Sequence, residues 1–336
     1  MKNRTFGHTL IELMIALAIG VFLLAGVSKM FTQTKVLYLK NQVNSDLQES
    51  GRFATEYLSK AIQLGHFLGG VQDLGQITVH NSIAEIPNNC GDQADFFNNA
   101  SITALFGVSV DNATLFGGCI NDRSSSTVFP SDAILVKYVS PNKIVDQNDN
   151  QEFDAADGIV ANAVYLTTFS SQGELTLGSQ IIAQAISTET DFNVWPFNLD
   201  VYYLSDRLGD GEEGVKSLMR YTLTENGMVN EVIAENIESL RILYGVDSQG
   251  DFGNVSYFPA NEIAGDTWDD VVSAKVYVVA FSESDPLYIN NTAYQIGDLG
   301  VRARDDDVRR SVMQTTVSIR NAVLRKVTQN GNANAN

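Results

Sequence analysis

The sequence is poor in cysteine, histidine and basic residues. Only 2 cysteines and 3 histidines occur in 336 residues, and 22 lysines and arginines stand against 40 aspartates and glutamates. The formal charge of −18 repels a phosphate backbone, which argues against a nucleic-acid partner. The sequence contains no CxxC pair, HExxH motif, GxSxG elbow or Walker-type phosphate loop. We therefore expect that the protein is not an enzyme and requires no cofactor.

Long apolar runs are scarce too, with one exception at the N-terminus. Residues 8–28 read HTLIELMIALAIGVFLLAGVS and hold a single carboxylate, Glu12. As an α-helix this run is about 31 Å long, which matches a hydrocarbon core of about 30 Å. Lys2 and Arg4 precede the run, and basic flanking residues favour the cytoplasm. We expect one transmembrane helix over residues 8–28, a cytoplasmic N-terminus and a periplasmic head.

The basic leader and the apolar run stand in the opposite order to a secretory signal, whose cleavage site follows its apolar core. Here the leader MKNRTFG, residues 1–7, ends before the apolar run begins. Cleavage between Gly7 and His8 leaves the helix on the mature chain and creates an ammonium group at His8. Glu12 lies four residues further along the same helical face, where it can neutralise this ammonium within one chain or between packed neighbours. The alternative is an acidic residue tolerated near the membrane interface.

Gly7 followed by HTLIELMIALAIG resembles the type III prepilin signal of type IV pilins and type II secretion pseudopilins. In these proteins a prepilin peptidase cuts after the glycine and methylates the new amine. The resemblance therefore implies cleavage between Gly7 and His8 and N-methylation of His8. The acidic residue that the family carries early in the mature chain falls on Glu12 and implies a role in assembly. The usual first mature residue is Phe, and His8 departs from this pattern.

The helix is expected to continue beyond the membrane. Apolar residues recur at helical spacing as far as Ile62, Gly51 interrupts their face and predicts a bend, and Gly65 suits a C-cap. Short alternating strands separated by Gly, Asn and Asp follow. The expected segments are an amphipathic continuation of the helix over residues 29–65, a β-rich globular head over residues 66–326 and a disordered tail over residues 327–336.

Four blocks of the chain resemble PilW-type minor pilins of type IV pili. They are LQESGRFATEYLSKAIQLGHF, which starts at Leu47, and residues 233–251, 268–283 and 309–321. The resemblance implies an α+β, pilin-like fold. In this fold a long N-terminal transmembrane and assembly helix packs on antiparallel β-sheets of a large periplasmic head.

The same resemblance implies a minor pilin that joins the type IV pilus near its tip, helps to initiate pilus assembly and supports adhesion or twitching. The expected partners are other minor and major pilins, contacted through the helix, the prepilin peptidase and the inner-membrane assembly platform. The chain would start in the inner membrane and end in the pilus at the cell surface. Two alternatives stay open: a J-type pseudopilin of a type II secretion pseudopilus, and a membrane-anchored periplasmic enzyme or calcium-dependent adhesin.

Cys90 and Cys119 both fall in the part of the chain expected outside the cytoplasm. An oxidising periplasm allows them to form a disulfide, which would close a loop of about 30 residues and stabilise the fold by about 3–4 kcal/mol. The alternative is two unpaired, buried thiols. PilW-type pilins often have a cysteine where this chain reads Gly69-Gly70, so the family's own pairing does not transfer directly.

One acidic loop, DQNDNQEFDAAD, has the spacing of a calcium site. Oxygen-bearing side chains occupy its positions 1, 3, 5, 7, 9 and 12, namely Asp146, Asn148, Asn150, Glu152, Asp154 and Asp157. Position 6 is Gln151, where the turn of a calcium loop favours glycine, and position 12 is Asp in place of the longer Glu. Bound calcium is therefore one expectation, and a solvated turn is the alternative.

Overall fold

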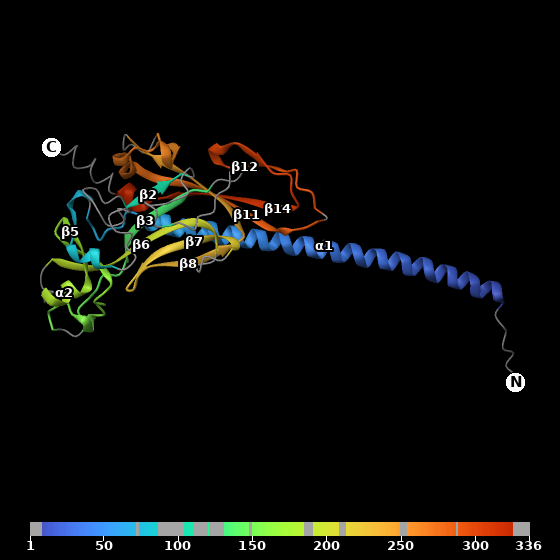
Figure 1. Cartoon of the computed structure of the whole chain (residues 1–336), viewed down its shortest axis with the longest axis horizontal. Helices are drawn as coiled ribbons and strands as arrows, with labels where there is room; N and C mark the ends of the chain where they lie inside the picture. Colours follow the sequence, from blue (N-terminus) through green and yellow to red (C-terminus); the bar gives the residue numbers. More distant parts are fainter. Residues whose placement is uncertain are drawn as a thin grey trace. The chain divides into compact units, whose positions relative to one another are not determined.

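The computed structural model describes residues 9–71, 74–86, 104–109, 120, 131–147, 150–184, 191–207, 213–248, 254–286 and 288–324 (Figure 1). They belong to two compact units, Met1–Gln48 and Glu49–Asn336. Several predictions concern residues outside the described ranges. These are the leader with Gly7 and His8, the cysteines Cys90 and Cys119, Asn148 of the acidic loop, and the tail over residues 327–336.

The long N-terminal helix is present as α1, which runs from Leu10 to Leu64. It contains no proline and is rich in Leu, Ala, Met and other strong helix formers. Among the described residues it is the one helix long and apolar enough to cross a membrane. Large apolar side chains are exposed from Leu10 to Leu39, whereas Leu58 and Ile62 near the end of the helix are fully buried.

Two glycines in this region have roles that differ from those expected. An unbroken helix runs through Gly51, where an added Cβ would lie 2.9 Å from the Cγ of Met313 and 3.4 Å from the Cβ of Ala280. Close packing against two neighbouring strands therefore explains this glycine. Gly65 follows the helix, but the residue with the left-handed backbone is His66, with a φ of 64°.

The head contains an eight-stranded sheet, here the large sheet, in the order β1-β5-β4-β6-β3-β2, with β7 beside β6 and β8 beside β7. Adjacent strands are antiparallel, except that β1 and β5 are parallel. The strands are β1 (Ile77–Val79), β2 (Leu105–Val108), β3 (Ala133–Val139), β4 (Val164–Phe169), β5 (Gln172–Leu177), β6 (Phe192–Arg207), β7 (Glu213–Thr224) and β8 (Gly227–Glu235).

The two faces of the large sheet pack against different parts of the head. Leu199, Val201 and Tyr203 of β6 belong to the main hydrophobic core, together with residues of β3, β4 and β5. Tyr202 alternates with them and points the other way, where its ring lies edge-on to the ring of Tyr57 of α1 at 6.0 Å. The period-two alternation of the strand thus places the end of α1 over one face and the main core over the other.

A second sheet, here the small sheet, has the order β10-β9-β11-β14 and is antiparallel throughout. Its strands are β9 (Ile237–Val246), β10 (Ser256–Pro259), β11 (Val271–Ser284) and β14 (Val308–Ser318). Only Asn236 separates β8 from β9, so one residue carries the chain from the large sheet to the small sheet. Its φ is 63°, and its carbonyl accepts the N–H of Phe281 at 2.9 Å.

A hairpin of β12 (Ala293–Gln295) and β13 (Val301–Ala303) packs on the small sheet. Ile296 in this hairpin is fully buried and forms a small core with Leu243, Tyr277 and Val279. The long helix and the two mainly antiparallel sheets together make an α+β fold, as the sequence predicts. The shorter described helices are α2 (Gly178–Gln184), η1 (Leu74–Gln76), η2 (Asn81–Glu85), η5 (Ala155–Asp157), η6 (Ala260–Glu262), η7 (Gly265–Asp270) and η8 (Gly297–Leu299).

Arg241 of β9 joins both sheets and the hairpin. Its guanidinium donates to Asp132, next to β3, at 2.9 Å, and to both carboxylate oxygens of Asp298, in η8, at 2.8 and 2.7 Å. Asp132 is fully buried and also accepts the N–H of Ile242 at 2.8 Å. Burial raises the pKa of Asp132 to about 6, although the charge of Arg241 opposes this rise. We call Asp132, Arg241 and Asp298 the Arg241 clamp.

Arg310 of β14 also binds two carboxylates, those of Asp306 and Glu238. It donates to the two carboxylate oxygens of Asp306 at 2.8 and 2.6 Å and also pairs with Glu238 of β9. Arg310 and Glu238 are both buried, so each needs the other to offset the loss of hydration. The hydrogen bonds from Arg310 lower the pKa of Asp306.

We expect the substitution Asp132→Asn to change how stability depends on pH. The folded pKa of Asp132 is about 6 against an ordinary value of 3.8, so between these values the folded chain binds more protons than the unfolded chain. The contribution of this group to the free energy of unfolding therefore falls as pH rises, by about 1 kcal/mol between pH 5 and pH 7. Urea unfolding of the full chain in detergent at pH 5 and pH 7 would measure this. Asp132→Asn should lose the slope, whereas exposed Asp191→Asn should keep it, and equal slopes in all three proteins would contradict the assignment.

The corner at Asn236 should tolerate glycine and reject a β-branched residue. Asn236→Gly should leave the unfolding free energy unchanged or slightly raised, because glycine adopts a positive φ without strain. Asn236→Val should cost about 1–2 kcal/mol in the same assay. The matched control is Glu235→Val, an exposed residue of β8, which should change stability by less than about 0.5 kcal/mol. Equal losses in the two valine variants would argue against backbone strain as the cause.

Candidate assembly site

Glu12 lies in the first turn of α1 and pairs with Thr9, the residue directly before the helix. The Glu12 carboxylate accepts the N–H of Thr9 at 3.0 Å and the Thr9 hydroxyl at 3.2 Å, and the Thr9 oxygen accepts the N–H of Glu12 at 3.3 Å. This is the reciprocal geometry of a capping box, which satisfies backbone donors at the start of a helix. The carboxylate also lies at the positive end of the helix dipole, which stabilises its charge.

Thr9 is a residue that the sequence analysis missed, although the pattern Thr-x-x-Glu over residues 9–12 was its signal. Both hydrogen bonds from Thr9 end on the same oxygen of Glu12, Oε2. The other oxygen, Oε1, is therefore available to a further donor. His8 lies outside the described residues, so the pairing of Glu12 with its amine stays a prediction.

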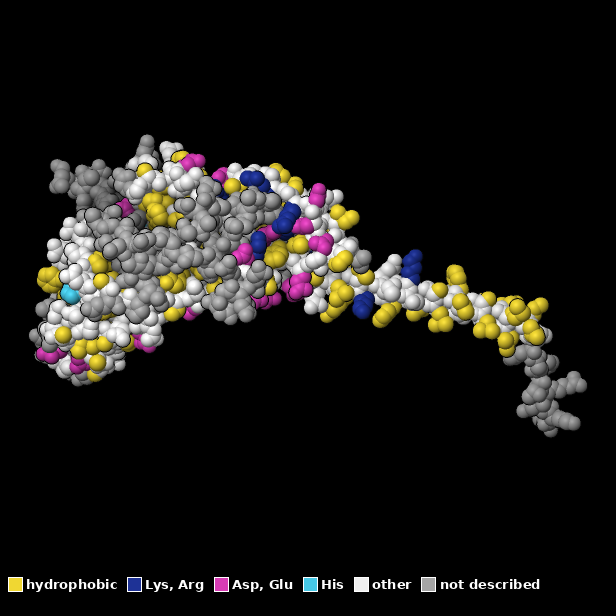
Figure 2. Space-filling view, in the orientation of Figure 1, with side chains coloured by type: hydrophobic (Ala, Val, Ile, Leu, Met, Phe, Trp, Pro, Cys, Tyr) yellow, Lys and Arg dark blue, Asp and Glu magenta, His cyan; other side chains and the backbone are white. Residues whose placement is uncertain are grey.

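Apolar side chains are exposed on all sides of α1 from this first turn to Leu39. Leu10, Phe22 and Leu24 are 78%, 80% and 70% exposed, and they point in different directions around the helix. Figure 2 shows hydrophobic side chains following one another along the helix, with lysines appearing only in its later part. A helix that is apolar on all sides is suited to a lipid environment or to the interior of a helix bundle.

The end of α1 lies beside a buried polar cluster on the large sheet. Asp200 of β6 accepts hydrogen bonds from the hydroxyls of Tyr138 and Tyr202 at 3.2 Å each and of Thr222 at 2.5 Å. Burial raises the pKa of Tyr138 and Tyr202, and the charge of Asp200 raises both further. The tyrosines therefore remain protonated donors, and the cluster acts as a fixed polar contact beneath Tyr57.

The described residues of the acidic loop that resembles a calcium site are held by hydrogen bonds to their own side chains. Gln151, at position 6, has a φ of 66°, so it adopts the left-handed conformation that glycine usually supplies there. The carboxylate of Asp146 accepts the N–H of Gln151 at 2.8 Å, and the side-chain oxygen of Asn150 accepts the N–H of Glu152 at 2.9 Å. Position 6 thus has the left-handed backbone of a calcium loop, supplied by Gln151 instead of glycine.

The second half of the loop is stabilised by its own carboxylates. Asp154 accepts the N–H of Ala156 at 2.6 Å and caps η5, while Asp157 is buried and accepts the N–H groups of Gln147 and Asp154 at 2.7 and 3.0 Å. Within the described residues, no group of three or more His, Cys, Asp or Glu side chains is arranged to hold a metal ion. A turn explains this geometry, and calcium binding stays a prediction that calorimetric titration of the full chain would check.

Comparisons with known proteins match both ends of the chain. A family model described as "Prokaryotic N-terminal methylation motif" matches residues 2–28, and one described as "Type IV Pilus-assembly protein W" matches residues 201–321. Among solved structures, a type IV-like pilin from Thermus thermophilus is similar at 10% sequence identity and a TM-score of 0.25, and the match covers 59% of this chain and 82% of that one. The comparison with curated proteins finds no match.

The two family matches fall on the N-terminal signal and on three of the four blocks that resemble PilW-type pilins, whereas the block that starts at Leu47 lies outside both. The first spans the leader, the Gly7–His8 junction and Glu12. The second contains the blocks 233–251, 268–283 and 309–321, which form β9, β11 and β14 of the small sheet with their flanks. The chain therefore carries a prepilin-type methylation motif at its N-terminus and, over residues 201–321, a region similar to type IV pilus-assembly protein W.

Proposed function

We propose that this chain is a minor pilin that enters the type IV pilus near its tip and helps to initiate pilus assembly, with its head supporting adhesion or twitching. The leader is removed between Gly7 and His8 by a prepilin peptidase, and the amine of His8 is methylated. Before assembly the chain sits in the inner membrane, with its N-terminus in the cytoplasm and its head in the periplasm. Its partners are other minor and major pilins and the inner-membrane assembly platform.

One observation carries this proposal: the prepilin motif overlaps the first part of α1, which exposes apolar side chains on all sides and holds Glu12 as its one carboxylate before Asp46. A carboxylate there costs energy in lipid unless a donor satisfies it. Thr9 supplies two donors to one oxygen of Glu12, and the other oxygen remains for a cationic amine. Such an amine, at His8 of the same chain or of a neighbour, would make insertion into a helix bundle favourable.

Location of the protein separates this function from that of a J-type pseudopilin. A minor pilin should occur at low stoichiometry in pili sheared from the cell surface. A pseudopilin would stay in the envelope, and its loss would block the release of secreted proteins. Mass spectrometry of the mature N-terminus would check processing at the same time. We expect a chain that begins at His8 with one methyl group, and deletion of the prepilin peptidase should leave the full leader in place.

The variant Glu12→Ala should insert into the membrane but enter pili poorly. Loss of one charge-assisted contact of about 1.4 kcal/mol per subunit would lower its amount in sheared pili about tenfold. The matched control is Glu56→Ala, which removes an exposed carboxylate from the same helix and should leave incorporation unchanged. Quantitative immunoblots of membranes and sheared pili would measure both pools. Normal incorporation of Glu12→Ala would contradict the assembly role.

A further inference from the structure

The exposed apolar surface of α1 is longer than the hydrocarbon core of a bilayer. Large apolar side chains are exposed from Leu10 to Leu39, a stretch about 45 Å long at the rise of an α-helix. The hydrocarbon core is only about 30 Å thick, and Leu10 to Ser28 already fill it. The stretch after Ser28 still exposes Phe31 and Tyr38, which are 70% and 68% accessible. Something other than water should therefore cover residues 29–40, here the juxtamembrane segment.

The juxtamembrane segment carries positive charge only. Lys29, Lys35 and Lys40 are its ionisable residues apart from Tyr38, and no acidic residue occurs between Glu12 and Asp46. All three lysines are exposed, and none makes an ion pair within the part of the chain that the structure describes. The occupant of this surface should therefore be anionic as well as partly apolar.

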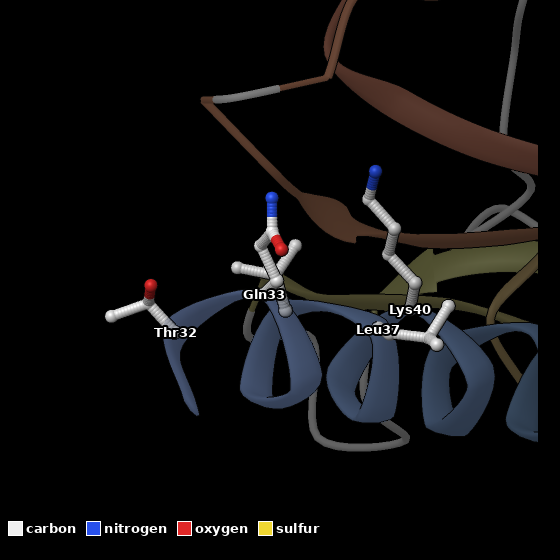
Figure 3. A pocket seen from close by; sticks show the side chains of 5 residues that line it. Thr32, Gln33, Leu37 and Lys40 are labelled. Atoms are coloured by element: carbon white, nitrogen blue, oxygen red, sulfur yellow. The ribbon is translucent and has the colours of Figure 1, made fainter. Parts of the chain in front are cut away.

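A shallow hollow lies within this segment. Its lining residues come from one side of the helix: Thr32, Gln33, Val36, Leu37 and Lys40. Figure 3 shows Gln33 and Lys40 extending to the same side of α1, two helical turns apart. Helical side chains lean towards the N-terminus, so the Lys40 ammonium reaches back over the preceding turn, in the direction of Ser28. The hollow thus combines an apolar floor with an ammonium, an amide and a hydroxyl group.

We propose that the juxtamembrane segment binds the headgroups of anionic phospholipids in the leaflet from which α1 emerges. This inference rests on the membrane-anchored topology of the proposed function. Lys29 falls directly at the end of the membrane span, where the headgroup layer begins, and lysine stems can lie along apolar surface while their ammonium groups reach phosphates. Phe31 and Tyr38 are residues of the kind that settle at such interfaces.

The position of the juxtamembrane segment, directly after the membrane span, favours lipid over a protein as the partner that covers it. The segment continues the membrane span without a break, so it meets lipid headgroups as soon as the chain is inserted. An acidic surface of a neighbouring pilin is the competing occupant, and it becomes available only after assembly. Lipid binding would hold the inserted monomer at a fixed depth and would be released when the chain leaves the membrane for the pilus.

Native mass spectrometry of the full chain in detergent tests this directly, with phosphatidylglycerol and phosphatidylcholine added in equal amounts. Wild type should retain phosphatidylglycerol preferentially, and 0.5 M salt during lipid loading should reduce the preference. In the triple variant K29Q/K35Q/K40Q, the ratio of retained phosphatidylglycerol to phosphatidylcholine should fall about fivefold for each lysine that contacts a headgroup. The charge-retaining variant K29R/K35R/K40R should keep it, and so should Lys60→Gln, an exposed lysine further along α1.

Equal retention of the two lipids by wild type would overturn the proposal, and so would an undiminished preference in the triple glutamine variant. If that variant also failed to enter pili, the segment would face a neighbouring subunit instead of lipid. The proposed function fails separately. A wild-type chain that alkali extracts from membranes, or that is missing from sheared pili, would contradict the anchored pilin whatever its lipid preference.

Discussion

Arg241 has two carboxylate partners, and they belong to different parts of the head. Asp132 leads into the large sheet, Asp298 lies in the hairpin, and Arg241 itself is on the small sheet. A buried guanidinium that loses one partner leaves an uncompensated charge, at a cost of about 3–5 kcal/mol. The relative position of the two sheets is therefore set by charge pairing as well as by apolar packing. Asn236 reinforces this constraint, because a one-residue connection leaves the chain almost no freedom between the sheets.

One helix serves two environments, and its sequence changes to suit each. The first part of α1 exposes apolar side chains on every side, as lipid or a helix bundle requires. The last part is amphipathic: Leu58 and Ile62 are buried, while Glu56 and Lys60 form an exposed ion pair. At Gly51, side chains of two strands of the small sheet lie too close to the helix to leave room for a Cβ. The first turn differs from both parts, because the capping box of Thr9 and Glu12 places polar groups at the start of an otherwise apolar stretch.

Much of this organisation could be predicted from local sequence patterns. The apolar run, the helical spacing beyond it and the alternating strands were sufficient for α1 and for strands such as β3 and β11, because their periodicities are direct consequences of burial. The Arg241 clamp could not be predicted, since its members are far apart in sequence and nothing local links them. The left-handed residues were misjudged as well. His66 and Gln151 adopt a backbone conformation that composition assigns to glycine. Thr9 was predictable and was missed because a partner for Glu12 was sought only at the new amine.

The unbroken course of α1 also has a mechanical meaning. Tension applied to the N-terminal part of the helix would pass along its hydrogen bonds into Leu58 and Ile62, which are locked in the core of the head. Met313 and Ala280, fitted against Gly51, would oppose sliding of the helix at this point. A pull on the helix would therefore meet close strand contacts and buried side chains between Gly51 and Ile62.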